Sequence, residues 1–424
     1  MTVPPPAPGS VATPSVEEHL AAVLETMGSL ETLPVSLADA HGCRLAEDVV
    51  ARSGLPGADT ALLDGYAVRA ADVAAATPTS PVSLRVVGDA HAGAAALALS
   101  VQAGCAVRVS AGASLPPGTD LLVPVPWSDG GLARVSVLQA PPVGGWIRRA
   151  GSDVAGGSVV LPRGTLLGPA QVGLLAAVGR GQVVVQPRPR VVVLSTARGL
   201  VEVGAPVAPG EVVDANSHLL AAACREAGAQ PYRVGVAPDS PRELLDALED
   251  HLIRADVLLA SGGARGAQPG GGGDVVAEVL ARLGTVSTAR VALHPGGTFA
   301  LGRVGPDEVP YLGLPGHPAS AFVAFELFVR PALRRVLGVA EPMRPRVPAR
   351  LAGPVSSAVG LRGYVPVSMV QAGGQWVATP LLAPGLHPLG ALGMAAGLAV
   401  VPEAAATLKE GAKVEVVLLE RRQG

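Results

Sequence analysis

The 424-residue chain has few aromatic residues and few cysteines. Aromatic residues make up 3% of it and are not interleaved with a lysine or arginine cluster, so nothing suggests a nucleic-acid-binding surface. The formal net charge of −2 gives no reason to expect a polymeric partner. Cys43, Cys105 and Cys224 are widely spaced and form no CxxC pair. This spacing argues against a zinc site or a disulfide framework and favours buried thiols in a reducing cytosol.

The sequence also lacks a long apolar run. The longest apolar stretch, LGALGMAAGLAVV at residues 389–401, is too short and too interrupted by glycine to span a bilayer. The first 15 residues show no basic segment followed by an apolar one, so we expect a mobile tail there rather than a signal peptide. These features predict a cytoplasmic protein with neither a membrane nor a nucleic acid as its partner.

Hydrophobic residues, glycine and proline are abundant. Hydrophobic residues make up 49% of the chain, and it contains 54 glycines and 40 prolines. The hydrophobic content predicts a globular protein, and the glycines and prolines predict many turns and short connections. At this length we expect two to four domains rather than a single core.

The first part of the chain reads as a helix followed by a small β domain. Ser15 and Glu18 form a capping-box pattern at the start of an amphipathic segment, which predicts a helix over residues 15–30. Short runs rich in valine and leucine, cut by glycine and proline, predict a β domain over residues 54–146.

Residues 147–187 return to mixed structure and contain a second helical pattern, PAQVGLLAAVG at residues 169–179. We expect this helix to pack on the first one. Residues 15–53 and 147–187 would then form one mixed helical linker or dimerisation domain, with the β domain inserted into it.

The second half of the chain changes pattern twice. Residues 188–338 alternate apolar strands with helices of ten residues or more, which predicts a doubly wound α/β domain with helices on both faces of a parallel sheet. Residues 339–424 return to short strands with proline and glycine breaks, which predicts a C-terminal β-barrel-like domain. The fold class expected for the whole chain is therefore α/β multidomain.

Three loops of the predicted α/β domain are candidates for a ligand site. They are residues 195–202, 261–274 and 313–320, and each follows a predicted strand. Ligands of doubly wound sheets bind beyond the carboxyl ends of the strands, and helix N-termini at that edge favour anions. The simpler interpretation is that Asp274 caps a helix and that the glycine-rich loops are turns. Neither glycine-rich loop matches a dinucleotide or Walker pattern, so the residues alone indicate only an anion-binding α/β domain.

Seven segments taken together, in their order and spacing, are more specific. They resemble the molybdopterin molybdotransferase family, to which the E domain of gephyrin also belongs, and the resemblance runs from about residue 15 to residue 420. LDGYAVR and LPGxPAS are its most specific motifs. The segments lie at residues 58–73, 106–123, 146–157, 189–217, 261–274, 291–302 and 312–329.

The resemblance implies an elongated homodimer of four-domain subunits whose α/β domain binds adenylylated molybdopterin. The implied reaction inserts molybdate into the dithiolene of the pterin, hydrolyses the adenylate and releases AMP, with Mg²⁺ as the divalent cation. It also implies a set of site residues. Asp64, Asp153 and Asp274 would be catalytic, and Asp239 and Asp274 would hold the metal. The residues that would bind the substrate are Arg148, Arg149, Asp239, Ser261, Gly262, Gly263, His294, Pro315, Gly316, Pro318 and Ser320.

This sequence departs from the family pattern at positions that would face the ligand, which predicts a degenerate active site. Arg198 and Gly199 stand where the TGDEL motif has two carboxylates, and Ala111 replaces a threonine. His294 and Gly297 stand where the family has lysines around its PGKP motif. His317 replaces the asparagine of LPGNP, and Arg265 lies in a lengthened 261–274 loop.

Losing two lysines that face an oxyanion should forfeit charge-assisted hydrogen bonds worth roughly 1.5 to 3 kcal/mol each. Arg198, Arg265 and His294 are candidates to restore part of the positive charge, although an arginine cannot replace a carboxylate that holds a metal. Many of the replacing residues are glycine, alanine or arginine, in a chain rich in all three. This suggests that the site drifted under compositional bias after selection for catalysis was relaxed.

Three functions stay open at this point. The first is an active molybdotransferase with a remodelled site, and the second is an inactive gephyrin-like scaffold that binds peptides of partner proteins. The third is a protein that binds the pterin or nucleotide without inserting the metal. The sequence does not distinguish molybdate from tungstate.

Each singled-out residue also has a simpler interpretation. Asp214 and Asn216 precede a helix and are expected to cap it, and Asp64 is expected to satisfy its own turn. Arg148 and Arg149 are expected to form surface ion pairs. His294 and His317 are not expected to bind zinc, since no third ligand lies at a suitable spacing.

Overall fold

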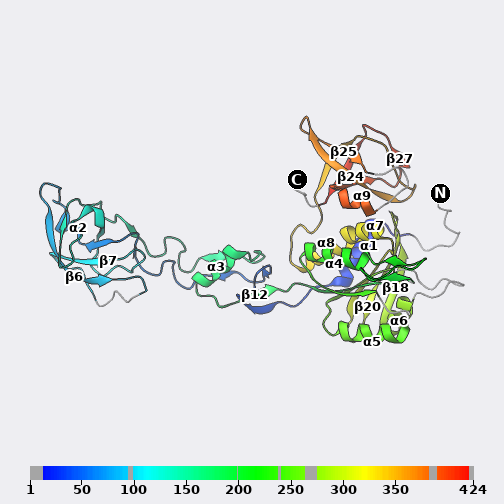
Figure 1. The fold of residues 1–424 in the computed structure, drawn as a ribbon, viewed down its shortest axis with the longest axis horizontal. Coiled ribbons are helices and arrows are strands. Elements are labelled where there is room, and N and C mark those ends of the chain that lie inside the picture. The colour runs from blue at the N-terminus through cyan, green and yellow to red at the C-terminus, as the bar shows by residue number, and fades with distance from the viewer. Residues whose placement is uncertain are drawn as a thin grey trace. The chain divides into compact units, whose positions relative to one another are not determined.

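The computed structural model describes residues 13–93, 99–197, 199–236, 240–262, 275–381 and 389–419. The chain falls into two compact units (Figure 1). The larger unit combines residues 1–33 with residues 186–424, and the smaller unit comprises residues 34–185. No helix among the described residues is long and apolar enough to cross a membrane.

A six-stranded mixed sheet forms the centre of the larger unit, with the strand order β16-β13-β17-β21-β20-β18. Its first four strands run parallel, as the sequence predicts, and are β16 (Gln230–Val236), β13 (Arg190–Ser195), β17 (Val257–Ser261) and β21 (Val309–Leu314). The last two, β20 (Thr298–Val304) and β18 (Gly284–Arg290), are antiparallel. These two strands were not predicted. The outermost strand, β18, contains no fully buried residue, so it lacks an apolar run that would mark it.

Helices cover both faces of this sheet, which confirms the doubly wound architecture (Figure 1). Val191 and Val193 of β13 face one core, and Val192 and Leu194 face the other, because successive side chains of a strand point to opposite faces. The first core is completed by α1 (Val16–Met27), α4 (Asn216–Ala227), α7 (Pro318–Ala324), the π-helical turn η3 (Phe325–Val329) and α8 (Arg330–Val336). The second is completed by α5 (Pro241–Leu252) and α6 (Val275–Leu283).

The first helix has the predicted capping box. Ser15 Oγ accepts a hydrogen bond from the Glu18 backbone N–H at 3.2 Å, and the Glu18 carboxylate accepts one from the Ser15 backbone N–H at 2.7 Å. The packing expected for this helix is wrong, however. Its buried residues join the core of the larger unit, whereas Leu175 of α3 (Pro169–Ala177) lies in a core of the smaller unit.

A closed five-stranded barrel forms the C-terminal part of the larger unit, which confirms the predicted barrel-like module. Its strands are β24 (Arg362–Ala372), β25 (Gln375–Pro380), β22 (Arg346–Leu351), β28 (Lys413–Leu418) and β26 (Gly397–Val401), and pairing of β24 with β26 closes it. The longest of them, β24, was not predicted. It contains Gly363 and Pro366, which weaken the strand signal in the sequence.

The larger unit also contains several short strands and one short helix. They are β14 (Leu200–Val201), β15 (Val212–Val213), β19 (Leu293–His294), β23 (Val355–Ser356), β27 (Thr407–Leu408) and α9 (Leu389–Met394). The pairing of β19 with β24 links the segment before β20 to the barrel.

The smaller unit contains the predicted β domain. A five-stranded sheet has the order β8-β5-β7-β6-β9, with β5 (Gly65–Val68), β6 (Val82–Ala90), β7 (Cys105–Val109), β8 (Leu121–Pro124) and β9 (Arg134–Val137). Two short helices, α2 (Ala70–Val73) and η2 (Val125–Trp127), lie between its strands in the sequence.

Short strand pairs and a three-stranded sheet complete this region of the chain. The pairs are β3 (Val49–Val50) with β11 (Val159–Leu161) and β4 (Thr60–Ala61) with β10 (Ile147–Arg148). The sheet contains β1 (Leu33–Ser36), β12 (Gln182–Gln186) and β2 (Arg44–Leu45).

Candidate functional site

Residues at the carboxyl ends of β13, β17 and β21 contact one another at one edge of the sheet. Ser195 and Ser261 are buried and share a hydrogen bond between their hydroxyl groups at 3.2 Å. The Thr196 N–H donates to the Ser261 carbonyl at 2.9 Å, and the Gly262 N–H donates to the Leu314 carbonyl at 3.1 Å. The three loops predicted to bind a ligand therefore begin side by side. The name strand-end cluster is used below for Thr196, Asn216, Ser261, Gly262, Gly296, Gly316 and Ser320.

The segment that carries His294 reaches this cluster through Gly296. Gly296 has a positive φ of 72°, and a Cβ atom placed on it would lie 2.6 Å from the Ser320 Cβ and 3.2 Å from the Pro315 Cβ. The two loops are therefore in close contact, and a larger residue at position 296 would push them apart. Pro315 and Ser320 are buried, and Pro318 is half-buried at the start of α7.

Asn216 holds the β21–α7 loop from the start of α4. Its Nδ2 donates a hydrogen bond to the Gly316 carbonyl at 2.7 Å, and this donation fixes the orientation of the amide. Asn216 is the first residue of α4 and does not cap it, so the expected capping role is wrong for Asn216. Asp214 does perform that role, because its carboxylate accepts from the Ser217 backbone N–H at 3.1 Å. Sequence reasoning missed the contact between Asn216 and Gly316.

Two histidines, His294 and His317, belong to the segments that carry the predicted site residues. Burial lowers the pKa of His294 below its ordinary value of 6.5, so the imidazole is neutral at pH 7. Burial therefore opposes the positive charge expected of His294, and its role in restoring charge stays a prediction. His317 is exposed and precedes the first residue of α7.

The described carboxylates at this edge do not fit a magnesium site. Asp214 is engaged by the backbone N–H and hydroxyl of Ser217, and Glu202 pairs with Arg233 at 2.7 Å. Within the part of the chain that the structure describes, no three of histidine, cysteine, aspartate and glutamate come together as a metal-binding group. The two acids predicted to hold the metal, Asp239 and Asp274, lie outside the described residues, as do Arg198, Gly263 and Arg265.

The remaining predicted residues lie together in the smaller unit. Pairing of β4 with β10 brings the LDGYA and WIRRAGSD motifs side by side. Asp64 accepts a hydrogen bond from the Ala111 backbone N–H at 2.8 Å, so its carboxylate bridges two loops rather than satisfying only its own turn. Arg148 pairs with Asp153 at 3.0 Å, and both side chains are about half-exposed. The expected surface ion pair of Arg148 is therefore confirmed.

Asp59 also belongs to the group of predicted site residues in the smaller unit, and sequence reasoning missed it. It accepts hydrogen bonds from the Ala150 backbone N–H at 2.8 Å and from the Arg149 guanidinium at 2.6 Å, which confirms the ion pair expected for Arg149. These donors lower the pKa of Asp59, the Ala150 N–H most strongly. Because this carboxylate fixes both the backbone after β10 and the Arg149 side chain, it orients Arg149.

An exposed apolar face adjoins the basic pair. Leu62 and Trp146 are the residues next to the β4–β10 pair, where the Leu62 N–H donates to the Trp146 carbonyl at 3.0 Å. Both of their side chains are exposed, whereas Ala61 and Ile147 are buried. Trp146 is 41% exposed and has a positive φ of 61°. Its ring makes an edge-to-face contact with the ring of Trp127, with 6.4 Å between the two ring centroids. Two of the chain's three tryptophans, Trp127 and Trp146, lie here. The grouping of such a rare residue type is the sequence feature that could have indicated this face.

The predicted site residues thus form two groups, one in each unit. Asp64, Arg148, Arg149 and Asp153 belong to the smaller unit, and the strand-end cluster with His294 belongs to the larger one. Cys43 and Cys224 are buried, as expected of structural thiols, while Cys105 is half-buried. Burial raises the pKa of the Cys224 thiol to about 12, so this thiol stays protonated at neutral pH.

Comparison with protein-family models finds three consecutive matches along the chain. Residues 14–179 match the MoeA N-terminal region (domains I and II), and residues 199–335 match a probable molybdopterin-binding domain. Residues 348–419 match the MoeA C-terminal region (domain IV).

Comparison with individual proteins gives full-length similarities. The chain is 41% identical to molybdopterin molybdenumtransferase 1 of Mycobacterium tuberculosis over 425 residues, covering 96% of this chain and 99% of that protein. It is 38% identical to molybdopterin molybdenumtransferase 2 of the same organism, covering 95% and 98% of the two chains. A solved structure of the molybdopterin biosynthesis protein MoeA from Pyrococcus horikoshii is 32% identical, covers 96% of this chain and 99% of that one, and superposes with a TM-score of 0.76. These similarities extend over both units and all three matched regions, and the chain belongs to the MoeA family of molybdopterin molybdenumtransferases.

Proposed function

We propose that this protein is a molybdopterin molybdenumtransferase that inserts molybdate into adenylylated molybdopterin and releases AMP. The observation that supports this most strongly is the 41% identity, over 96% of the chain, to a protein named for that activity. The three predicted ligand loops begin side by side at the ends of β13, β17 and β21, and this supports the proposal independently, because ligands of doubly wound sheets bind at that edge. The comparisons give no support to a scaffold function, and we do not propose one.

In this proposal the strand-end cluster holds the anionic parts of the substrate mainly with neutral donors. The Ser320 hydroxyl and loop N–H groups are such donors, and burial opposes a positive charge on His294. Hydrogen bonds from these neutral donors to an anionic oxygen are still charge-assisted, but they lack the positive countercharge that a lysine would add. We therefore propose a degenerate site with retained chemistry and weakened affinity for the oxyanion.

The smaller unit would supply the acids and cations assigned by family resemblance. Asp64 and Asp153 are the proposed catalytic acids of this unit, and Arg148 and Arg149 are the proposed cations for phosphate or molybdate oxygens. Each of these arginines already has a carboxylate partner, so ligand oxygens would have to compete with Asp153 and Asp59.

The proposal also includes a magnesium ion, a homodimer and a cytoplasmic location, all of which rest on family resemblance and composition. Asp239 and Asp274 are the proposed magnesium ligands, and magnesium, when bound there, would neutralise charge on the phosphoanhydride. A buried thiol such as Cys224 agrees with a reducing compartment.

The test is AMP release by the purified protein given adenylylated molybdopterin, molybdate and Mg²⁺. We expect AMP and molybdenum cofactor from the wild type, and a loss of both in Asp274→Ala. Asp307→Ala is the matched control, since Asp307 is an exposed acid in the turn between β20 and β21 of the same unit. Absence of turnover together with absence of binding by calorimetry would refute the proposal, whereas binding without turnover would favour a ligand-binding protein.

A further inference from the structure

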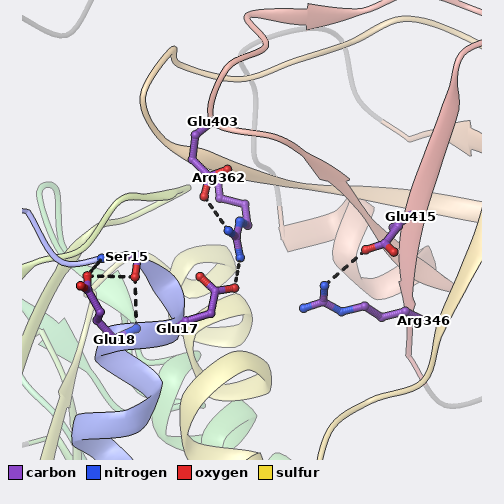
Figure 2. A network of polar contacts seen from close by, with 7 residues as sticks. All are labelled: Ser15, Glu17, Glu18, Arg346, Arg362, Glu403 and Glu415. Atoms are coloured by element: carbon purple, nitrogen blue, oxygen red, sulfur yellow. Dashed lines mark hydrogen bonds and ion pairs between the residues drawn. The ribbon is translucent and has the colours of Figure 1, made fainter.

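Arg362, the first residue of β24, connects three segments of the larger unit (Figure 2). Its guanidinium pairs with Glu17 in the first turn of α1 and with Glu403 after β26, the latter at 2.7 Å. The Arg362 side chain is only 18% exposed, although the Glu17 side chain is 63% exposed, so the guanidinium itself is largely shielded from solvent. The hydrogen bond from Arg362 is the main cause that lowers the pKa of Glu17. Glu17 is therefore a charged partner of Arg362 at neutral pH.

The same residue holds the start of the segment that reaches the strand-end cluster. The Arg362 backbone N–H donates to the Ala292 carbonyl at 2.9 Å, and β24 pairs with Leu293 and His294 in parallel register. The Ala292 N–H in turn donates to the Pro14 carbonyl at 2.9 Å. Residues 292–294 therefore lie between residue Pro14, just before α1, and the first residues of β24. The ion pair between Arg362 and Glu17 connects these two flanking segments to each other.

The held segment leads directly into the proposed substrate site. Two residues after His294, Gly296 contacts Ser320 and Pro315 so closely that no side chain fits between them. A small displacement of β19 would therefore move either Gly296 or the Ser320 loop. Misplacing a binding group by about 1 Å can reduce the rate of catalysis by about a hundredfold. The contact between Gly296 and the Ser320 loop therefore affects the proposed activity.

We propose that Arg362 is a positioning residue of the active site: by joining α1 to the barrel, it fixes residues 292–296 against the Ser320 loop. The inference rests on the proposed function and assigns to the barrel a role that the fold alone does not. Arginine suits this position because its planar guanidinium can donate to two carboxylates at once, whereas lysine offers a single charged centre. Arg362 acts on the substrate only through the β19 segment.

The test compares Arg362→Gln with Arg346→Gln in the otherwise complete protein. Arg346 is a matched control because it also forms an arginine–glutamate pair in the barrel, with Glu415 at 3.3 Å, but this pair is about half-exposed and lies on β22 and β28 (Figure 2). We expect Arg362→Gln to raise KM for adenylylated molybdopterin by roughly tenfold or more, a change of about 1.4 kcal/mol, and Arg346→Gln to leave it unchanged. Arg362→Lys should recover part of the loss, and Glu403→Gln should give an intermediate KM.

A second readout does not depend on turnover. Hydrogen exchange of peptides that cover residues 291–297 should accelerate several-fold in Arg362→Gln and stay at the wild-type rate in Arg346→Gln. Equal KM values and equal exchange rates in the two variants would overturn the positioning role. If the wild type itself shows no turnover, the proposed function fails, and the exchange experiment alone decides whether Arg362 fixes this segment.

Discussion

Acidification from pH 7 towards pH 4 is expected to destabilise the larger unit through one side chain, His19. This residue of α1 is 5% exposed, and its ring lies 4.7 Å from the ring centroid of Phe299 and 4.8 Å from that of Phe328. Burial lowers its pKa from the ordinary value of 6.5 to about 4, because the charged imidazolium would lose its hydration between two phenylalanine rings. The folded protein therefore keeps His19 neutral where the unfolded chain would protonate it.

The sign and size of the effect follow from linkage. The folded pKa lies below the unfolded pKa, so the stabilisation is fully present above pH 6.5 and is lost as the pH falls through about 4. The difference between pKa values of 6.5 and about 4 corresponds to about 3 kcal/mol of unfolding free energy. This is a substantial part of the roughly 5 to 15 kcal/mol by which a typical domain is stable.

Urea unfolding at pH 7.5, 6.0, 5.0 and 4.5 can measure this loss in the wild type and in His19→Leu. Trp376 of β25 reports on the larger unit alone when Trp127 and Trp146 are both replaced by phenylalanine, since the chain has three tryptophans. The unfolding free energy of His19→Leu should fall less steeply below pH 6.5 than that of the wild type. Because burial also lowers the pKa of His294, His294→Leu serves as a comparison. Identical pH slopes in the wild type and His19→Leu would refute the argument.

Three further outcomes are expected. Gly296→Ala should reduce the initial rate of AMP release by about tenfold or more, because its Cβ would collide with the neighbouring loop, whereas Gly390→Ala, where a Cβ meets open space, should be neutral. Glu326→Gln should lower the urea unfolding free energy by about 3 kcal/mol, since it leaves buried guanidinium groups without a full countercharge. Asn216→Ala should weaken AMP binding measured by calorimetry and cost about 1 kcal/mol of stability, the net contribution of one hydrogen bond, because water can replace the lost donor at the exposed Gly316.

The pattern of apolar residues along the chain predicted most of the helices and strands, because the spacing of buried side chains within one element can be read from neighbouring residues. The strands at 190–195 and 257–261 are almost entirely buried, and each is followed by a helix that covers one face of the sheet. The strand at 362–372 escaped prediction because glycine and proline interrupt it, yet it is paired along its length within a closed barrel. Tertiary pairing thus overrode weak local propensity.

The geometry of the candidate site depended on contacts that no local pattern encodes. Asn216 and Gly316 are separated by 100 residues in the chain, and Arg149 and Asp59 by 90. The motifs placed these residues near ligand loops, but only the fold shows which side chains hold the loops and which face them. The charge of His294 is a second example, because its pKa depends on burial that the neighbouring residues in sequence do not reveal.

The substitutions at ligand-facing positions and the contacts that shape the cluster involve different residues. Asn216, Ser261 and Gly262 hold the loops through backbone carbonyls and neutral groups, so these contacts between the strand ends do not require a lysine. Gly297 adds a constraint of its own. Its carbonyl accepts from the Val291 N–H at 2.6 Å, and a Cβ there would lie 2.6 Å from the Val291 carbonyl oxygen. We therefore expect that a lysine introduced at position 297 would have to displace this contact before it could add positive charge to the proposed site.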